Sequence, residues 1–530
     1  MVGMRRCLRC SNPNPHLNLN LHPNRPAPCL SAETQRANGE IRIKIKIKIK
    51  IGVKSWSKNW RRAGLWGSQP PSRSRLQIAG AGDNDSHMRI PGRLLSLAVI
   101  GTICSSPAQA VKDREAAVRQ DRAALEQDPR WLYNDFQRGL AEAQRTGKPL
   151  LVVLRCVPCL ACAGIDAAVL RQAEKELAPL LDQFVCVRVI NANALDLARF
   201  QFDYDLSFST MIFNGDGTVY GRYGSWTHQH EFQNTTIAGY QRALEGALAL
   251  HRGYPTNQLA LAGKQGVALP FKTPLEIPPL AGKYKADLDW EGKVVPSCVH
   301  CHQIGDAIRA SYRDQKKAMP TEWIYPMPAP ETIGLTLAPE QAALVKSVAA
   351  GSAAAQAGVQ AGDEIISLAG QPLISIADVS WALHRAPESG AVPLVMKRGG
   401  AQKVLQLALP ANWRGKSDIS KRVGTWSMRG MATGGMVLRD LGDEERTQRR
   451  VGPDKLALFV SGLGQYGIHA AAKKAGFLKE DVIVELDGRS DRITEGELLG
   501  FLLQNHQSGE IVKATVLRGS EHVELSLPMQ

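Results

Sequence analysis

The stretch Lys148-Pro-Leu-Leu-Val-Val-Leu-Arg-Cys156-Val-Pro-Cys159-Leu-Ala-Cys162-Ala-Gly-Ile-Asp166 decides the fold of the segment around it. Its consecutive apolar residues 150–154 predict a buried strand, because a half-exposed strand would alternate in polarity. Three cysteines follow at two-residue gaps, and apolar residues then recur at helical spacing, so the last cysteines should open a helix. A helix N-terminus favours the thiolate through its dipole and its unsatisfied N–H groups. The order strand, Cys-x-x-Cys and helix therefore predicts a reactive dithiol.

The composition is that of an ordinary globular protein. The chain has 530 residues, of which 44% are hydrophobic and 22% are charged, enough for about three or four domains. Almost all of its net charge of +15 arises in residues 1–110, and the rest of the chain holds 47 basic against 46 acidic residues. This balance gives no support for nucleic-acid binding.

The N-terminal region predicts a start site and a signal peptide. In residues 1–87, Ile alternates with Lys or Arg over 41–51, a pattern best explained as a translated simple repeat upstream of the true start, or as a disordered segment. Residues 88–110 combine a basic start, a short apolar core and the small-residue pair Ala108 and Ala110, as signal peptides do. The sequence thus predicts a periplasmic or secreted protein, cleaved after Ala110 and without a stable membrane span.

The next two segments resemble a thioredoxin. Residues 111–130 predict a solvated lead-in helix. Residues 131–254 then predict, in order, a helix, the buried strand, the cysteine cluster, a helix, three more strands and a final helix. This order resembles the thioredoxin fold, which implies a thiol–disulfide activity. Two pairings of the cysteines stay open. Cys159 with Cys162 is favoured, because Asp166 then stands where thioredoxin-like relatives carry an acidic residue, and the alternative is Cys156 with Cys159.

One departure from the thioredoxin pattern leaves room for a metal. Ser209 stands where thioredoxins place a cis-proline, which in that family keeps metals away from the cysteines. Cys159 and Cys162 with His228 or His230 would then suit copper or zinc, although exposed loop histidines are the plainer interpretation.

Residues 255–330 predict a proline-rich linker that carries a second cysteine motif. The run Cys298-Val-His-Cys301-His302 fits c-type haem attachment, with two thioethers to haem and His302 as an axial ligand of its iron. Met319 or Met327 is the candidate for the other axial position. The alternatives are a second redox pair and half of a zinc site.

The remainder predicts two related domains. Residues 331–411 resemble the PDZ domains of bacterial periplasmic proteases, and the loop that would bind a peptide carboxylate is Ile333-Gly334-Leu335-Thr336-Leu337. Residues 412–530 repeat part of this pattern and predict a second, diverged PDZ-like domain. Its corresponding loop is 434–438, followed by a charged loop at 439–453, and a purely structural role is the favoured interpretation.

The whole layout resembles a family of exported bacterial thioredoxin-like/PDZ fusion proteins, some of which carry selenocysteine. The predicted fold class is multidomain, with a thioredoxin-like α/β domain, a linker with the haem motif and two β-rich PDZ-like units. The predicted function is thiol–disulfide exchange or electron transfer, in which Cys159 attacks, Cys162 resolves and the PDZ units recruit exported proteins by their C-termini. The alternatives are an adaptor with an inactive thioredoxin-like scaffold and a copper-handling protein.

Overall fold

The computed structural model describes most of the chain from residue 113 onward and a short hairpin before it. The described residues are 30–37, 40–47, 113–158, 163–172, 177–224 and 235–530. The chain forms two compact units, residues 1–99 and residues 100–530. In the first unit, β1 (Leu30–Ala37) and β2 (Glu40–Ile47) pair as an antiparallel hairpin. The predicted signal peptide lies outside the described residues.

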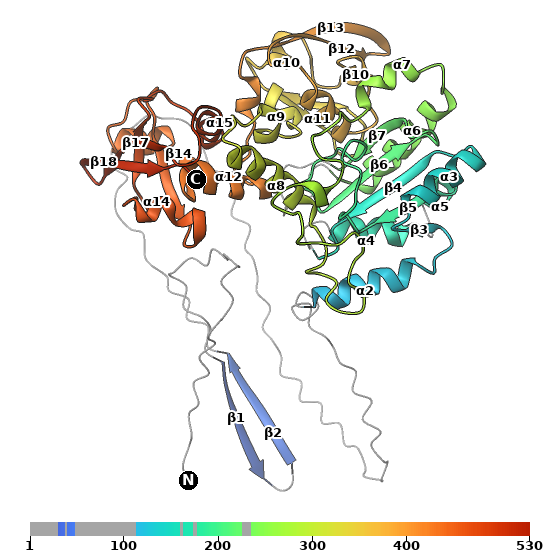
Figure 1. The fold of residues 1–530 in the computed structure, drawn as a ribbon, viewed down its shortest axis with the longest axis horizontal. Helices are drawn as coiled ribbons and strands as arrows, with labels where there is room; N and C mark the ends of the chain where they lie inside the picture. The colour runs from blue at the N-terminus through green and yellow to red at the C-terminus, as the bar shows by residue number, and fades with distance from the viewer. Residues whose placement is uncertain (1–29, 38–39, 48–112, 159–162, 173–176, 225–234) are drawn as a thin grey trace, which may run out of the picture. The chain divides into compact units, whose positions relative to one another are not determined.

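A five-stranded mixed sheet forms the centre of the predicted thioredoxin-like domain (Figure 1). Its strands are β3 (Trp131–Tyr133), β4 (Leu150–Arg155), β5 (Val185–Val189), β6 (Phe208–Phe213) and β7 (Val219–Tyr223), in the spatial order β3-β5-β4-β6-β7. β3, β5 and β4 run parallel, whereas β6 and β7 are antiparallel to their neighbours. The predicted buried strand is β4, in which every residue is buried.

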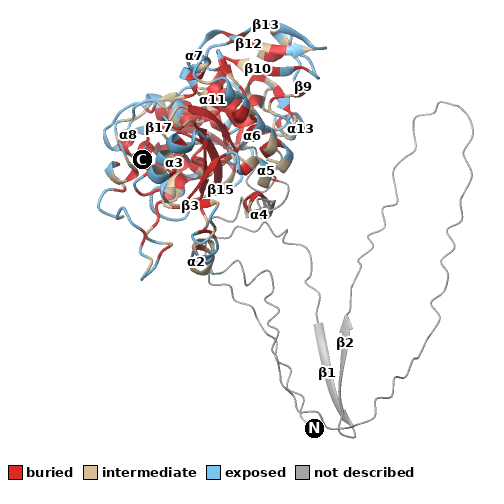
Figure 2. Cartoon of the chain, turned by 90° about the vertical axis from the view of Figure 1, so that its right-hand side faces the viewer, coloured by how far each residue is buried: buried red, intermediate tan, exposed pale blue. Residues whose placement is uncertain are grey.

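Helices cover both faces of this sheet. Side chains of β4 alternate between the faces, so that Leu150 and Val152 enter one apolar cluster and Leu151 and Val153 the other. The helices are α3 (Phe136–Thr146), beside the first cluster, and α4 (Ala163–Gln172), α5 (Ala178–Leu181) and α6 (Ile237–Arg252), beside the second. Figure 2 shows the buried residues gathered within the strands and helices and the exposed residues along the outer loops.

Residues 255–330 differ from the predicted linker, because they form an ordered part of this domain. Their elements are α7 (Gln258–Leu261), η1 (Ala262–Lys264), η2 (Pro274–Glu276), α8 (Cys301–Asp314), α9 (Thr321–Ile324) and η3 (Pro330–Ile333). In α8, Ile304, Ala307 and Ile308 join the apolar cluster of Leu150 and Val152. The helix therefore packs on the sheet, and the dense prolines upstream mark irregular but well-packed chain.

The lead-in helix, α2 (Arg114–Leu125), differs from the prediction of a solvated helix. Val118 and Leu125 are buried, and the Glu115 carboxylate accepts hydrogen bonds from the N–H groups of Val294 and Val295, both at 3.0 Å. The helix thus fastens the irregular chain before α8 to the rest of the domain.

The segment after η3 forms two small sheets around one core. Its elements are β8 (Leu335–Leu337), β9 (Val345–Val348), α10 (Ala353–Gln356), β10 (Glu364–Leu368), β11 (Gln371–Pro372), α11 (Ile376–His384), β12 (Gly390–Arg398) and β13 (Ala401–Leu409). β8 pairs with β9, and the larger sheet has the order β11-β10-β12-β13.

The C-terminal segment forms a five-stranded antiparallel sheet in the order β14-β15-β16-β17-β18. Its elements are η4 (Trp413–Lys416), α12 (Val423–Thr433), β14 (Met436–Asp440), α13 (Asp443–Gln448), β15 (Leu458–Leu463), η5 (Gly467–Ala470), α14 (Ala471–Lys474), β16 (Val482–Leu486), α15 (Glu495–Asn505), β17 (Ile511–Arg518) and β18 (Glu521–Pro528). The insertion expected as a loop at 439–453 contains the short helix α13.

Each of the last two domains contains an ion-paired turn of the same kind. In the first, Arg398 pairs with Asp363 at 2.7 Å and also donates to the Gly358 carbonyl at 2.8 Å. In the second, Arg518 pairs with Asp481 at 2.8 Å and donates to a glycine carbonyl at the equivalent place. Equivalent residues of the sequence repeat thus make equivalent contacts.

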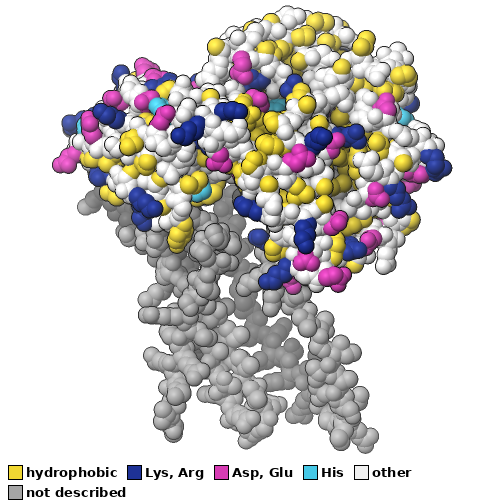
Figure 3. Space-filling view, in the orientation of Figure 1, with side chains coloured by type: hydrophobic (Ala, Val, Ile, Leu, Met, Phe, Trp, Pro, Cys, Tyr) yellow, Lys and Arg dark blue, Asp and Glu magenta, His cyan; other side chains and the backbone are white. Residues whose placement is uncertain are grey.

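The surface of the described unit agrees with the balanced charge of residues 111–530. On the face in Figure 3, Lys and Arg side chains are interspersed with Asp and Glu. Among the described helices, none combines the length and the apolar character needed to span a membrane.

Candidate thiol site and peptide-binding surfaces

Cys156 lies at the carboxyl end of the central strand β4. Its N–H donates to the Ser207 carbonyl at 2.9 Å, which continues the pairing of β4 with β6 beyond the strand end. The residue is 7% exposed. Ser209, which the sequence placed opposite the cysteines, lies inside β6 and pairs with Leu154. Ser207 is thus the residue that meets the start of the cysteine segment.

A histidine from the second cysteine motif contacts Cys156. The Cys156 sulfur lies 3.0 Å from Nδ1 of His300, which is the N-cap residue of α8. The His300 N–H donates to Oε1 of Gln303 at 2.8 Å, and its carbonyl accepts from the Gln303 N–H at 2.9 Å. Because α8 packs on the sheet, its N-cap residue His300 is fixed at the end of β4. Sequence reasoning treated His300 as a spacer, and only the packing of α8 identifies it.

His300 stays neutral at physiological pH. Burial, with smaller contributions from the neighbouring charges of His302 and Arg114, lowers its pKa to about 4. The rings of His300 and His302 are 5.9 Å apart. A neutral imidazole that carries its proton on Nδ1 is a hydrogen-bond donor toward the Cys156 sulfur.

Buried ion pairs hold α4 against the sheet beneath the thiol. Asp166 of α4 accepts from Arg155 Nε at 3.0 Å and from the two Arg188 Nη atoms at 2.6 and 3.1 Å. Arg188, whose side chain is fully buried, also pairs with Asp121 of α2. Burial acts to raise the pKa of Asp166, but the two guanidinium groups outweigh it and hold the pKa below its usual range. Asp166, which the sequence used to choose a cysteine pairing, is therefore a structural anchor.

The segment with the predicted haem motif does not fit a haem as it is packed. Cys298 and Cys301 are each 8% exposed and lie in different apolar clusters, Cys298 with Ile190 and Cys301 with Ile304. Burial raises the pKa of Cys298 to about 11. Thioether bonds to one porphyrin require both sulfurs to be reachable from a common space, whereas each cysteine is buried in an apolar cluster of its own.

The candidate axial methionines belong to other parts of the core. Met319 packs in the core of the C-terminal domain, and its N–H donates to the Leu503 carbonyl at 3.1 Å. Met327 lines a pocket whose wall includes Tyr204 and His384. Neither lies in the apolar cluster of Cys298 or that of Cys301.

Other predicted site residues lie outside the part of the chain that the structure describes. Cys159, Cys162, His228 and His230 fall in segments that the structure does not describe, so the favoured cysteine pair and the copper alternative stay predictions. Within the described part of the chain, no three His, Cys, Asp or Glu residues are grouped as a metal site would need.

Two family models match the domains described above. The first, of a thioredoxin-like family, matches residues 131–215, and the second, of the PDZ domain, matches residues 344–398. The chain joins a thioredoxin-like domain to a PDZ domain.

Solved structures give weaker likenesses. An HtrA-type protease, AlgW with a decapeptide, is 17% identical over 30% of this chain and 44% of its own, with a TM-score of 0.18. A variant of the same protease, also with a decapeptide, is 18% identical over 26% and 40%, with a TM-score of 0.17. The chain thus spans less than half the length of these proteins. The comparison with curated proteins gives no match.

The predicted carboxylate loop of the PDZ domain turns directly into an edge strand. Gly334 has φ +85°, and a Cβ there would lie 2.1 Å from the Ser352 side chain, so the turn requires glycine. β8 follows, and within the described residues only β9 pairs with it. Thr336, in the middle of β8, is exposed. A peptide strand has an unpaired edge to join here.

Helix α11 of the PDZ domain is fastened to the thioredoxin-like domain. Its Asp378 pairs with Lys264 at 2.6 Å, with both side chains 1% exposed, and accepts from the Arg222 N–H at 3.0 Å. Arg222 lies over the ring of Trp381 at 3.6 Å. These buried contacts fix the position of α11 on β7.

In the C-terminal domain, a side chain of the same domain contacts the corresponding loop, residues 434–438. Leu438, at its end, donates its N–H to the Glu495 carboxylate at 2.8 Å, and Glu495 also pairs with Arg429 of α12 at 2.6 Å. A carboxylate of the chain itself therefore uses a donor of this loop, which suits the structural role expected for this copy.

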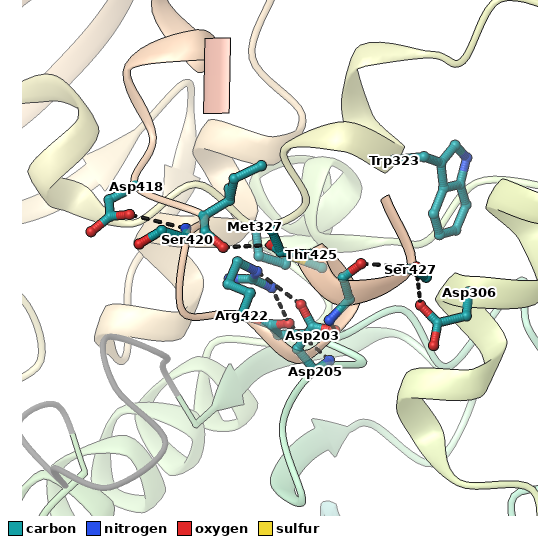
Figure 4. A network of polar contacts seen from close by, with 12 residues as sticks. Asp203, Asp205, Asp306, Trp323, Met327, Asp418, Ser420, Arg422, Thr425 and Ser427 are labelled. Atoms are coloured by element: carbon teal, nitrogen blue, oxygen red, sulfur yellow. Dashed lines mark hydrogen bonds and ion pairs between the residues drawn. The ribbon is translucent and has the colours of Figure 1, made fainter. Parts of the chain in front are cut away.

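A buried cluster joins the C-terminal domain to the thioredoxin-like domain. Arg422, just before α12, lies between Asp203 and Asp205, and the Gly424 N–H donates to Asp205 at 3.1 Å (Figure 4). Nearby, the Ser427 hydroxyl donates to Asp306 of α8 at 2.6 Å. The helix that carries His300 at its start is thus braced from both sides.

Proposed function

We propose that this protein carries out thiol–disulfide exchange on exported protein partners that its PDZ domain recruits. The observation that carries the proposal is the position of Cys156, at the carboxyl end of the central thioredoxin-like strand and in contact with an imidazole. The dithiol is formed by two of Cys156, Cys159 and Cys162. Export follows from the predicted signal peptide at 88–110, and the compartment it implies is one in which disulfides persist.

Recruitment is assigned to the first PDZ domain. Its loop 333–337 leads into β8, whose second edge suits the addition of a peptide strand with a free carboxylate. The C-terminal domain, with Glu495 in its own loop, is assigned a bracing role. Haem is left out of the proposal because the packing of Cys298 and Cys301 does not fit it.

The proposal is tested by exchange with a fluorescent disulfide. The full chain, reduced and freed of reductant, is mixed with a self-quenched disulfide-linked peptide pair, and the release of fluorescence is followed. We expect a stoichiometric release, with about one disulfide cleaved per reduced dithiol, that disappears when Cys156, Cys159 and Cys162 are all replaced by Ala. Equal rates for the two proteins would remove the redox role and leave the adaptor, in which the thioredoxin-like domain is only a scaffold.

A further inference from the structure

The segment from Cys298 to His302 forms one wall of the thiol site. Its two cysteines are buried in the core. Between them in the sequence is His300, whose Nδ1 lies 3.0 Å from the Cys156 sulfur at the carboxyl end of β4. Hydrogen bonds between His300 and Gln303 fix the backbone at the start of α8. The motif that predicts haem attachment therefore places the His300 imidazole in contact with the Cys156 thiol.

We propose that His300 donates a hydrogen bond to Cys156 and stabilises its thiolate, which makes Cys156 the cysteine that attacks a protein disulfide. This assignment rests on the proposed function and corresponds to the pairing of Cys156 with Cys159 that the sequence left as the alternative. A hydrogen bond to the charged form of a group lowers its pKa, and cysteine reactivity follows the thiolate. His300 acts as a neutral donor, so it neither gains nor loses a proton.

Among the described residues, the other charged groups near the thiol make contacts of their own. Arg155 donates to the Cys156 carbonyl, and its charge is compensated by Asp166 at 3.0 Å. His302 faces the His300 ring, and Arg114 of α2 acts on His300 from a longer range. The N-terminus of α8, which begins beside the thiol, adds the positive end of a helix dipole.

The step that Cys156 performs is a single exchange. Its thiolate attacks one sulfur of a substrate disulfide R–S–S–R′, forming the mixed disulfide Cys156–S–S–R and breaking the S–S bond. The Cys156 sulfur is oxidised, R′–S⁻ leaves with the electron pair, and R′–S⁻ takes its proton from water. The proton that Cys156 loses beforehand also goes to water.

The test follows the alkylation of Cys156 by iodoacetamide as a function of pH. This small reagent suits a thiol that is 7% exposed. Trypsin cuts the full chain after Arg155 and Arg171, and fragment ions of peptide 156–171 give the rate at each cysteine. The pH midpoint reports the thiolate and does not depend on how easily the reagent reaches the sulfur. His300→Ser removes the ring but keeps a favourable N-cap for α8. His300→Asn places an amide N–H near the position of Nδ1, and His302→Ser is the matched control.

We expect a midpoint below about 8.5 for the unmodified chain. It should rise by one to two pH units, about the worth of a hydrogen bond to a charged group, in His300→Ser. His300→Asn should restore much of the shift, and His302→Ser should leave the midpoint in place. Equal midpoints in the unmodified chain and His300→Ser, with amide exchange in α8 unchanged, would overturn the assignment. A shift in His302→Ser as large as that in His300→Ser would also overturn it. Failure of the proposed function looks different, since it is loss of disulfide exchange whatever the midpoint.

Discussion

Replacing Asp166 tests how much the buried ion pairs beneath the thiol site stabilise the thioredoxin-like domain. Asp166→Asn removes the charge that compensates Arg155 and Arg188, whose side chains are 3% and 0% exposed. Breaking a buried ion pair from one side costs about 3–5 kcal/mol. Since Arg188 keeps its second partner, Asp121, we expect the lower end of that range, about 3 kcal/mol.

The control is a pair of the same chemistry at the surface. Glu245 and Arg242 of α6 lie 2.9 Å apart, with side chains 48% and 56% exposed. Glu245→Gln should change the free energy of unfolding by less than about 1 kcal/mol, because solvent screens an exposed pair.

Amide hydrogen exchange of β4 and β5 is the appropriate assay, because it reports the opening free energy of this sheet separately from the other domains. The reasoning predicts a loss of protection in Asp166→Asn well beyond that in Glu245→Gln. If the two variants lose the same protection, within about 0.5 kcal/mol, the buried network does not anchor α4.

Four further predictions concern the second cysteine motif and the PDZ domain. Cys298, whose pKa burial raises to about 11, should resist iodoacetamide at pH 8. Because the unfolded thiol releases its proton first, near 8.5, Cys298 should also lower stability as pH rises from about 8.5 to 11, by about 1.4 kcal/mol per pH unit. Denaturation midpoints should show a shallower alkaline decline in Cys298→Val, and an unchanged slope would contradict the burial argument. Protein made with haem-maturation machinery should give no haem-peroxidase band on a denaturing gel, whereas a band lost in Cys298→Ala/Cys301→Ala would establish haem attachment. A fluorescein-labelled decapeptide with a free C-terminal leucine should bind the full chain, and amidation should abolish binding; equal affinity for both forms, by fluorescence anisotropy, would rule out capture by the loop 333–337.

Local sequence pattern was enough for the elements that depend on periodicity. The apolar run 150–154 predicts β4, in which every residue is buried. The partial repeat between residues 331–411 and 412–530 also has a counterpart in the structure, since Asp363 and Asp481 make equivalent ion pairs.

Long-range packing was beyond the reach of local pattern. Prolines before α8 predict a linker, yet the chain there is held by contacts with α2 and the sheet, which no local period records. His300 sits 144 positions from Cys156, and its spacing to Cys298 and Cys301 matches a motif with a different meaning. The structural role of Asp166 could not be predicted for the same reason, since Arg188 becomes its partner only when β5 lies beside β4.

The central claim, a reversible dithiol at the end of β4, is tested most directly by equilibrating the full chain in glutathione buffers of graded potential. After acid quenching and alkylation, the mass of peptide 156–171 gives the fraction oxidised. We expect one reversible two-electron transition, and the oxidised form should contain a disulfide that includes Cys156. The same midpoint should be reached on titration in either direction. A peptide that carries no disulfide at any glutathione ratio would contradict it.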